Sequence, residues 1–158
     1  MSEGVVETRL REAGLELPSV PTPVAQYVPA KVVGDFVYVS GQGPISHGTA
    51  THVGRVGREV SQQEAYEAAR TCILNALAAV NSITGSLDRI SEIVHVRAFV
   101  NSDPDFHEQP AVANGASDLL VDLFGEKGRH TRAALGTSNL PGNIPVEIEL
   151  LVRVDPLS

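Results

Sequence analysis

The sequence predicts an α+β fold, a two-layer sandwich in which two long helices cover one face of a mixed β-sheet. Two long segments carry apolar residues at three- and four-residue spacing, which is the pattern of amphipathic helices. Segments that alternate apolar and polar residues lie before, between and after them, as expected of half-buried strands. Counting from Tyr27, the predicted order is ββ–α–β–α–ββ. The 158 residues suit one domain that needs no disulfide or structural metal to fold.

The first 22 residues are predicted to form an N-terminal arm, and residues 23–158 a single domain. Glu3 to Leu15 mixes charged and apolar residues, which predicts a short helix that ends at Gly14. The connector that follows contains three closely spaced prolines, Pro18, Pro21 and Pro23. Because proline removes a backbone donor and fixes φ, they exclude a continuing helix and indicate an extended connector.

A β-hairpin is predicted next. Tyr27 to Val33 and Phe36 to Ser40 are rich in strand-forming residues, and Gly34-Asp35 between them is a turn signal. Gly41 to Arg58 contains five glycines and is predicted to be a loop.

The first long helix is predicted to start after Ser61, because Glu64 three residues later completes a capping box. Its apolar stripe consists of Ala65, Ala69, Cys72, Ile73, Ala76, Leu77 and Val80. Gly85 is placed to end it. The remaining predicted elements are a strand at Ile90–Val100, a helix at Phe106–Phe124, a strand at Arg132–Thr137 and a strand at Pro145–Val154.

One face of the predicted sheet stays bare because both helices cover the other. Alternation places Val94, Val96, Ala98 and Val100 under the helices. It places on the bare face Ile93, His95, Arg97, Phe99, Glu147, Glu149 and Leu151. A partly apolar bare face indicates a protein partner, and a second copy of the chain is the simplest one.

Composition excludes several classes of function. The net charge of 12 − 19 = −7 disfavours a nucleic-acid partner, since such proteins present basic surfaces. The lone cysteine, Cys72, excludes an intramolecular disulfide and a cysteine-clustered zinc site, and its apolar helical setting predicts burial. The sequence has no apolar leader and no run long enough to cross a membrane, so no membrane partner and a cytoplasmic location are expected.

Few residues carry chemistry on their own. Arg132 starts a strand after a loop and suits bidentate binding of a carboxylate; the alternative is an ion pair with Glu147 or Glu149. Those two glutamates share a strand face, which favours one of them being protonated or near a cation, unless both are simply solvated or ion-paired. Tyr27 could stack on a flat ligand or serve as an ordinary strand aromatic.

Several short motifs together resemble the RidA/YjgF family, formerly called the endoribonuclease L-PSP family. Val39-Ser40-Gly41-Gln42-Gly43-Pro44 resembles its Ser-Gly-Gln-x-Pro signature, and Thr131-Arg132-Ala133-Ala134 its Arg-Ser/Ala motif. Leu140-Pro141 followed by Val146-Glu147-Ile148-Glu149 is similar to its ending. The resemblance covers about Tyr27 to Val154. Asn75 fits the family's pattern in the first long helix, and the segment from Asn114 to Leu120 resembles a longer-chain subgroup.

The resemblance implies a chorismate-mutase-like fold and a homotrimer with active sites in the clefts between subunits. It implies hydrolytic deamination of reactive 2-imino and 2-enamino acids to 2-oxo acids and ammonia, without cofactor or metal. Arg132 would then hold the carboxylate of the small substrate and Glu147 would position or activate water. Tyr27, Gly41 and Ala134 would line the substrate pocket.

The resemblance has two departures. Many deaminating members have cysteine where this chain has Ala134, and many have glutamate where it has Gly136. A trimer that binds small molecules or acts like a chaperone, without turnover, is therefore the second interpretation. An RNA-cleaving translation inhibitor is the third, and the acidic balance disfavours it.

Overall fold

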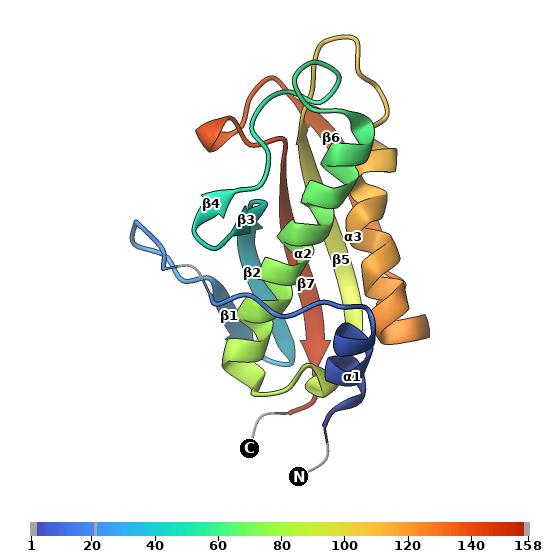
Figure 1. Ribbon diagram of the computed structural model, residues 1–158. Coiled ribbons are helices and arrows are strands. Elements are labelled where there is room, and N and C mark those ends of the chain that lie inside the picture. The colour runs from blue at the N-terminus through green and yellow to red at the C-terminus, as the bar shows by residue number, and fades with distance from the viewer. Residues whose placement is uncertain (1–2, 21, 157–158) are drawn as a thin grey trace.

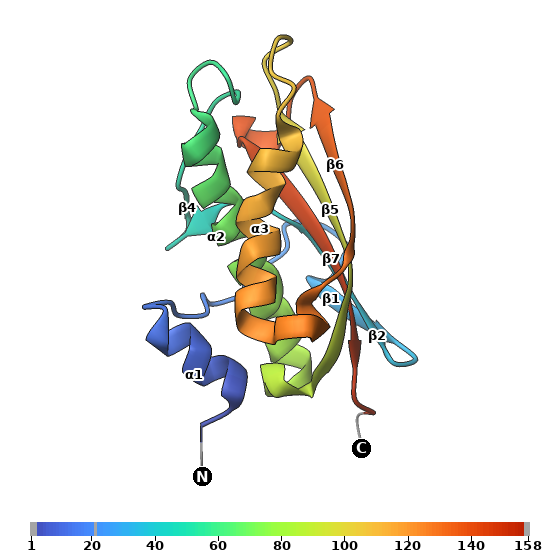
Figure 2. The ribbon, with the colours of Figure 1, turned by 90° about the vertical axis from the view of Figure 1, so that its right-hand side faces the viewer.

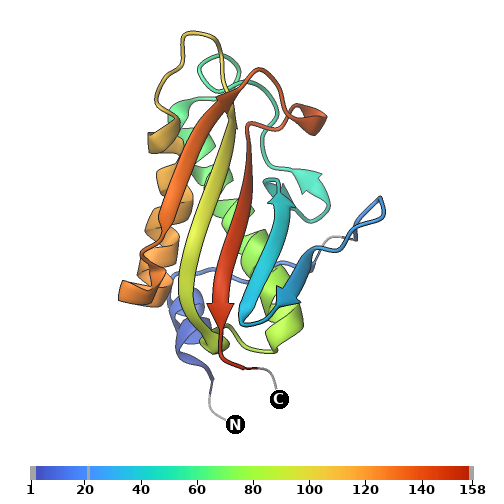
Figure 3. The same ribbon diagram turned by 180° about the vertical axis from the view of Figure 1, so that it is seen from behind.

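The computed structural model describes residues 3–20 and 22–156. Its main sheet has the strand order β1-β2-β7-β5-β6, in which only the β5–β6 pair is parallel. The strands are β1 (Ala30–Val33), β2 (Phe36–Gln42), β5 (Ile90–Asn101), β6 (Thr131–Thr137) and β7 (Val146–Val154). Helices α2 (Gln62–Thr84) and α3 (Gln109–Phe124) cover one face (Figures 1 and 2), and Figure 3 shows the opposite face bare. This confirms the predicted fold class.

The core lies between the two helices and the sheet. Ile73 and Leu77 of α2 and Leu119 of α3 are at most 1 % exposed, and they pack on buried sheet residues such as Val96 and Ile148. Burial of this many aliphatic side chains is the main driving force for folding, at about 25 cal/mol per Å² of apolar surface. Cys72 is buried in the same cluster, as predicted.

Both predicted ends of α2 are confirmed. The hydroxyl of Ser61 accepts a hydrogen bond from the backbone N–H of Glu64, and the Glu64 carboxylate accepts one from the backbone N–H of Ser61. Gly85 ends the helix with φ of +78°, a left-handed conformation that glycine adopts without steric cost.

The second helix is shorter than predicted. It starts at Gln109, with Glu108 as its N-cap, and not at Phe106. Pro110 lies in its first turn, where the missing N–H would have no helical acceptor, so the proline marks the start. Phe106 belongs to a turn in which its N–H donates to the carbonyl of Asp103.

The first strand is also shorter than predicted, because it starts at Ala30 and not at Tyr27. Pro29 has no N–H to donate to a ladder, and its carbonyl accepts from the N–H of Ser40. Tyr27 therefore lies before β1, and its side chain is 53 % exposed.

The segment predicted as a loop contains a small hairpin. Strands β3 (Ile45–Ser46) and β4 (Thr49–Ala50) pair across His47 and Gly48. Both turn residues have positive φ, +52° and +80°, as a tight two-residue hairpin turn requires. Asparagine and glycine are the usual residues in such a turn, so a histidine at its first position concealed the hairpin in the sequence.

A β-bulge in β5 corrects part of the face assignment. Ile93 pairs with Val152 and Val96 pairs with Leu150, so β5 spans three steps where β7 spans two. The extra residue shifts the alternation, and Ile93 is fully buried under the helices instead of lying on the bare face. Val94, predicted to be under the helices, is only half-buried. The remaining predicted residues of the bare face keep their places.

The N-terminal helix forms as α1 (Val5–Glu12) and packs against the domain (Figure 2). Val6 and Leu10 are buried in the common core. The Asp88 carboxylate accepts hydrogen bonds from the first two backbone N–H groups of α1, at 2.8 and 3.0 Å. Such a contact satisfies donors that have no partner inside the helix and favours the positive end of its dipole.

Close contact between α2 and α3 depends on Gly115. A Cβ at this position would collide with the backbone carbonyl oxygen of Tyr66 and lie 3.2 Å from the Cβ of Ala69. Alanine normally favours a helix over glycine by about 1 kcal/mol. We nevertheless expect Gly115→Ala to lower the free energy of unfolding by about 1–3 kcal/mol, because the helices must separate. Urea denaturation measures this.

Asp122→Ala, at an exposed position of the same helix, is the matched control and should change the free energy of unfolding by less than about 0.5 kcal/mol. Full wild-type stability of Gly115→Ala would contradict the close helix contact.

Candidate active site

Two of the residues predicted for the site, Gly41 and Glu147, lie side by side on neighbouring strands. The pairing of β2 with β7 is irregular between Val39 and Gln42, which places Gly41 next to the start of β7. A Cβ at Gly41 would lie 2.8 Å from Oε2 of Glu147. A side chain here would push the carboxylate away, so the glycine leaves room for Glu147 and exposes its own backbone beside it.

The Glu147 carboxylate is half-buried and, among the residues that the structure describes, makes no hydrogen bond or ion pair. Burial raises the pKa of Glu147, and the nearby charge of Glu149 raises it further. Glu149 differs because it forms an ion pair with Arg97 at 3.2 Å. The like-charged pair predicted from the sequence thus separates into one paired carboxylate and one unpaired carboxylate that is suited to proton transfer.

Arg132 lies on β6, at the edge of the sheet, and its side chain meets α3. Its Nη1 donates to Oδ1 of Asn114 at 2.8 Å and to Oγ of Ser117 at 3.1 Å. Within the chain it forms no ion pair with Glu147 or Glu149, and Glu149 pairs with Arg97 instead. The guanidinium keeps the capacity to bind an external carboxylate.

A single chain does not bring Arg132 and Glu147 together. In the β5–β6 ladder Arg132 pairs with the buried Val96, which places it on the face under the helices. Glu147 pairs with Phe99 on the bare face. The sheet separates the two side chains. Ala134 lies on the same face as Arg132, since it pairs with the buried Ala98.

Sequence reasoning missed the polar partners of Arg132. Asn114 and Ser117 are three residues apart on α3 and so point to the same side of that helix. A third residue, His130, contacts Ser117 with 2.8 Å between Nε2 and Oγ. The three-residue spacing of Asn114 and Ser117 indicates that they share one side of α3. Their contact with Arg132 follows only from the position of β6 beside this helix.

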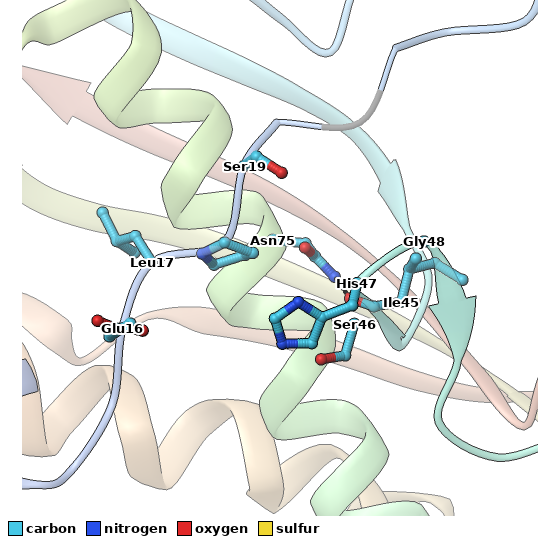
Figure 4. A pocket seen from close by; sticks show the side chains of 9 residues that line it. Glu16, Leu17, Ser19, Ile45, Ser46, His47, Gly48 and Asn75 are labelled. Carbon is cyan, nitrogen blue, oxygen red and sulfur yellow. Dashed lines mark hydrogen bonds between the residues drawn. The ribbon is translucent and has the colours of Figure 1, made fainter.

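A cavity of about 400 Å³ lies elsewhere, between the N-terminal segment, the β3–β4 hairpin and α2 (Figure 4). Leu17 and Ser19 border it on one side, and Ile45 and His47 on another. Asn75 is 2 % exposed at its edge and donates to the carbonyls of Gly43 and Ile45, which ties the hairpin to the helix. None of the predicted site residues lines this cavity.

The described residues contain neither a metal-binding cluster nor a membrane-spanning helix. No group of three or more His, Cys, Asp or Glu side chains in 3–20 and 22–156 is arranged to hold a metal ion. Over the same ranges, none of the helices combines the length and apolar character needed to span a bilayer.

The fold and these motifs define a family, which comparison with known proteins identifies. The family model described as "YjgF/chorismate mutase-like, putative endoribonuclease" matches residues 7–153. The chain therefore belongs to the YjgF (RidA) family, as the sequence motifs predicted.

Individual relatives cover nearly the whole chain. It is 38 % identical over 156 residues to Protein TCP17 of Trypanosoma cruzi, covering 98 % of both chains. It is 28 % identical over 141 residues to a 2-iminobutanoate/2-iminopropanoate deaminase of Dermatophagoides farinae, covering 89 % of this chain and 95 % of the relative. The crystal structure of protein Atu1372 from Agrobacterium tumefaciens, of unknown function, superimposes with a TM-score of 0.90 at 43 % identity, covering 96 % of this chain and 93 % of that one.

Proposed function

We propose that the protein hydrolyses reactive 2-imino and 2-enamino acids to 2-oxo acids and ammonia, at clefts between the subunits of a homotrimer. The observation that carries this proposal is the unpaired, half-buried carboxylate of Glu147 beside Gly41, on a sheet face that no helix or strand of the described residues covers. The deaminase relative from Dermatophagoides farinae supports the reaction class.

The positions of Arg132 and Glu147 support a site shared between copies. Within one chain these two side chains lie on opposite faces of the sheet, so they cannot hold the same small molecule. Arg132 lies on the edge strand and is exposed, which leaves it accessible to a neighbour. In the proposed trimer, Arg132 of one copy meets Gly41 and Glu147 of the next, and Tyr27 and Ala134 complete the pocket wall.

The chemistry needs only orientation and proton transfer, so the proposal includes no cofactor or metal. Arg132 binds the substrate carboxylate and fixes the adjacent C=N carbon near a water molecule held by Glu147. Glu147 accepts a proton from the water as the water oxygen bonds to the C=N carbon, and the protonated Glu147 then gives this proton to the nitrogen. The carbinolamine that results loses ammonia and leaves the 2-oxo acid. An enamine first takes a proton on carbon and loses one from nitrogen to become the imine.

A non-catalytic trimer that binds small molecules is the second candidate, and Ala134 is the observation that favours it. The methyl group at this position leaves only backbone contacts to a ligand and supplies no thiol. An RNA-cleaving activity remains the third interpretation and has less support, because the net charge is −7. The lone buried cysteine agrees with a cytoplasmic location, which we include in the proposal.

The test is the rate of ammonia and 2-oxo acid release from an imine generated in place by an amino-acid oxidase. The protein should accelerate release above the spontaneous rate, in proportion to its concentration. Binding of the product 2-oxobutanoate without acceleration would exclude the deaminase proposal and support the binding trimer. Salt-sensitive binding of RNA would instead support the third interpretation.

A further inference from the structure

We infer that Ser117 and His130 are positioning residues that hold Arg132 in one orientation, and that His130 does so as the neutral Nδ1–H tautomer. This inference rests on the proposed function for its consequence, carboxylate binding by Arg132. The direction of each hydrogen bond follows from the contacts of Arg132, Ser117 and His130 and does not depend on the proposed function.

The direction of every bond follows from which atoms can donate. Arginine carries only donors, so Oγ of Ser117 accepts from Nη1 of Arg132 at 3.1 Å. The single hydroxyl hydrogen of Ser117 is then free to donate to Nε2 of His130 at 2.8 Å. The carbonyl of Gly128 can only accept, so Nδ1 of His130, 2.6 Å away, carries the proton. One imidazole tautomer satisfies both contacts, and it is neutral.

The surroundings of His130 favour the same state. Its imidazole is half-buried, burial lowers its pKa, and the nearby positive charge of Arg132 lowers it further, against an opposing effect of the Gly128 carbonyl. A protonated ring would present an N–H to Ser117 and turn the hydroxyl hydrogen away. Ser117 would then have to accept from two donors that are both positively charged. The neutral ring avoids this conflict.

The network leaves the other edge of the guanidinium open. Asn114 and Ser117 take Nη1, while Nε and Nη2 of Arg132 have no partner among the residues described. A bidentate pair with a carboxylate uses two parallel N–H groups of this kind. Because Nη1 is anchored, the guanidinium has fewer orientations to lose, so less side-chain entropy is lost when a ligand binds at the Nε–Nη2 edge. His130 therefore acts on the ligand through Ser117 and Arg132.

The tautomer is tested directly by ¹⁵N NMR of the imidazoles. We expect His130 near neutral pH to show a protonated Nδ1 and an unprotonated Nε2. The control is His107, which is exposed and whose ring makes no hydrogen bond among the described residues, so no contact selects one of its two tautomers. A protonated Nε2 on neutral His130 would overturn the inference.

The effect on Arg132 is tested with two readouts. In Ser117→Ala and His130→Ala, the Nη hydrogens of Arg132 should exchange faster with solvent, and the Kd for 2-oxobutanoate should rise by up to about 10- to 150-fold, the loss expected for one hydrogen bond to a charged group. His130→Gln offers an acceptor near the position of Nε2 and should restore much of both. His107→Ala should change neither.

These experiments distinguish failure of the positioning role from failure of the proposed function. Unchanged exchange and affinity in both alanine variants would overturn the positioning role, even if the wild type deaminates imines. If wild type neither accelerates imine hydrolysis nor binds 2-oxobutanoate, the proposed function fails, and the Nη exchange rates still decide whether Ser117 and His130 orient Arg132. In an active enzyme, His130→Ala should raise KM more than it lowers kcat, since Arg132 binds the unreacting carboxylate.

Discussion

Arg132→Ala should lower kcat/KM for 2-imino acids by about 10²- to 10³-fold. The guanidinium is the only charged group proposed to bind the substrate carboxylate, and loss of one partner of a hydrogen-bonded charge pair costs about 2–5 kcal/mol. The side chain is exposed and, within residues 3–20 and 22–156, hydrogen-bonds to Asn114 and Ser117 only, so its removal should leave the fold intact. Steady-state release of ammonia and 2-oxo acid measures the loss.

The matched control is Arg129→Ala, three residues earlier. Arg129 is exposed and forms an ion pair with Glu126, at 3.2 Å, so its loss should leave kcat/KM unchanged. Arg132→Lys should recover only part of the activity, because an ammonium group cannot reproduce the planar fork of donors. Equal rates in wild type and Arg132→Ala would exclude Arg132 from substrate binding.

Glu147→Gln should lower kcat by about 10²- to 10⁴-fold, the usual contribution of a general base. The amide has nearly the same shape but cannot accept a proton at neutral pH, so binding of 2-oxobutanoate should persist. Glu92→Gln is the control, since Glu92 is an exposed carboxylate paired with Arg153 and far from Gly41 in the sheet. Retained turnover in Glu147→Gln would remove Glu147 from the proposed chemistry.

The same variant gives a second readout through stability. The folded-state pKa of Glu147 is raised, so the folded state disfavours its charged form. The resulting penalty is absent below the unfolded pKa of about 4.5 and develops as pH rises through the folded pKa. Glu147→Gln should therefore denature at a higher urea concentration than wild type at pH 7, and this advantage should vanish near pH 4. A lower midpoint at pH 7 would mean that the ionised carboxylate has a stabilising partner.

The fold was largely predictable because its signals are local. Capping of α2 by Ser61 and Glu64 and the strict alternation of β7 each need only a few neighbouring residues. The predictions were wrong where a tertiary contact or a single irregularity determines the side on which a residue lies or the conformation of a turn. The bulge in β5 inverts the side on which Ile93 lies, and nothing in the sequence of that strand marks it. Similarly, a histidine such as His47 does not predict the positive φ that this hairpin turn requires.

The candidate site was predictable only in part. Family motifs singled out Arg132 and Glu147, but neither their separation by the sheet nor the contact of Arg132 with Ser117 follows from spacing along the chain. Both the separation and the contact depend on which strands pair with each other in the sheet. The side-by-side placement of Gly41 and Glu147 likewise requires β7 to insert beside β2, far from it in sequence.

The place of β7 in the sheet matters for biosynthesis. It is the last strand described, yet it joins the β1–β2 pair to the β5–β6 pair. A nascent chain without residues 146–154 would hold two separate ribbons, each with an open backbone edge bordering apolar side chains. Such edges are templates for aggregation. The domain should therefore close in one late step, and ribosome stalling or proteolysis before Val146 would yield chains that aggregate instead of partly folded, soluble ones.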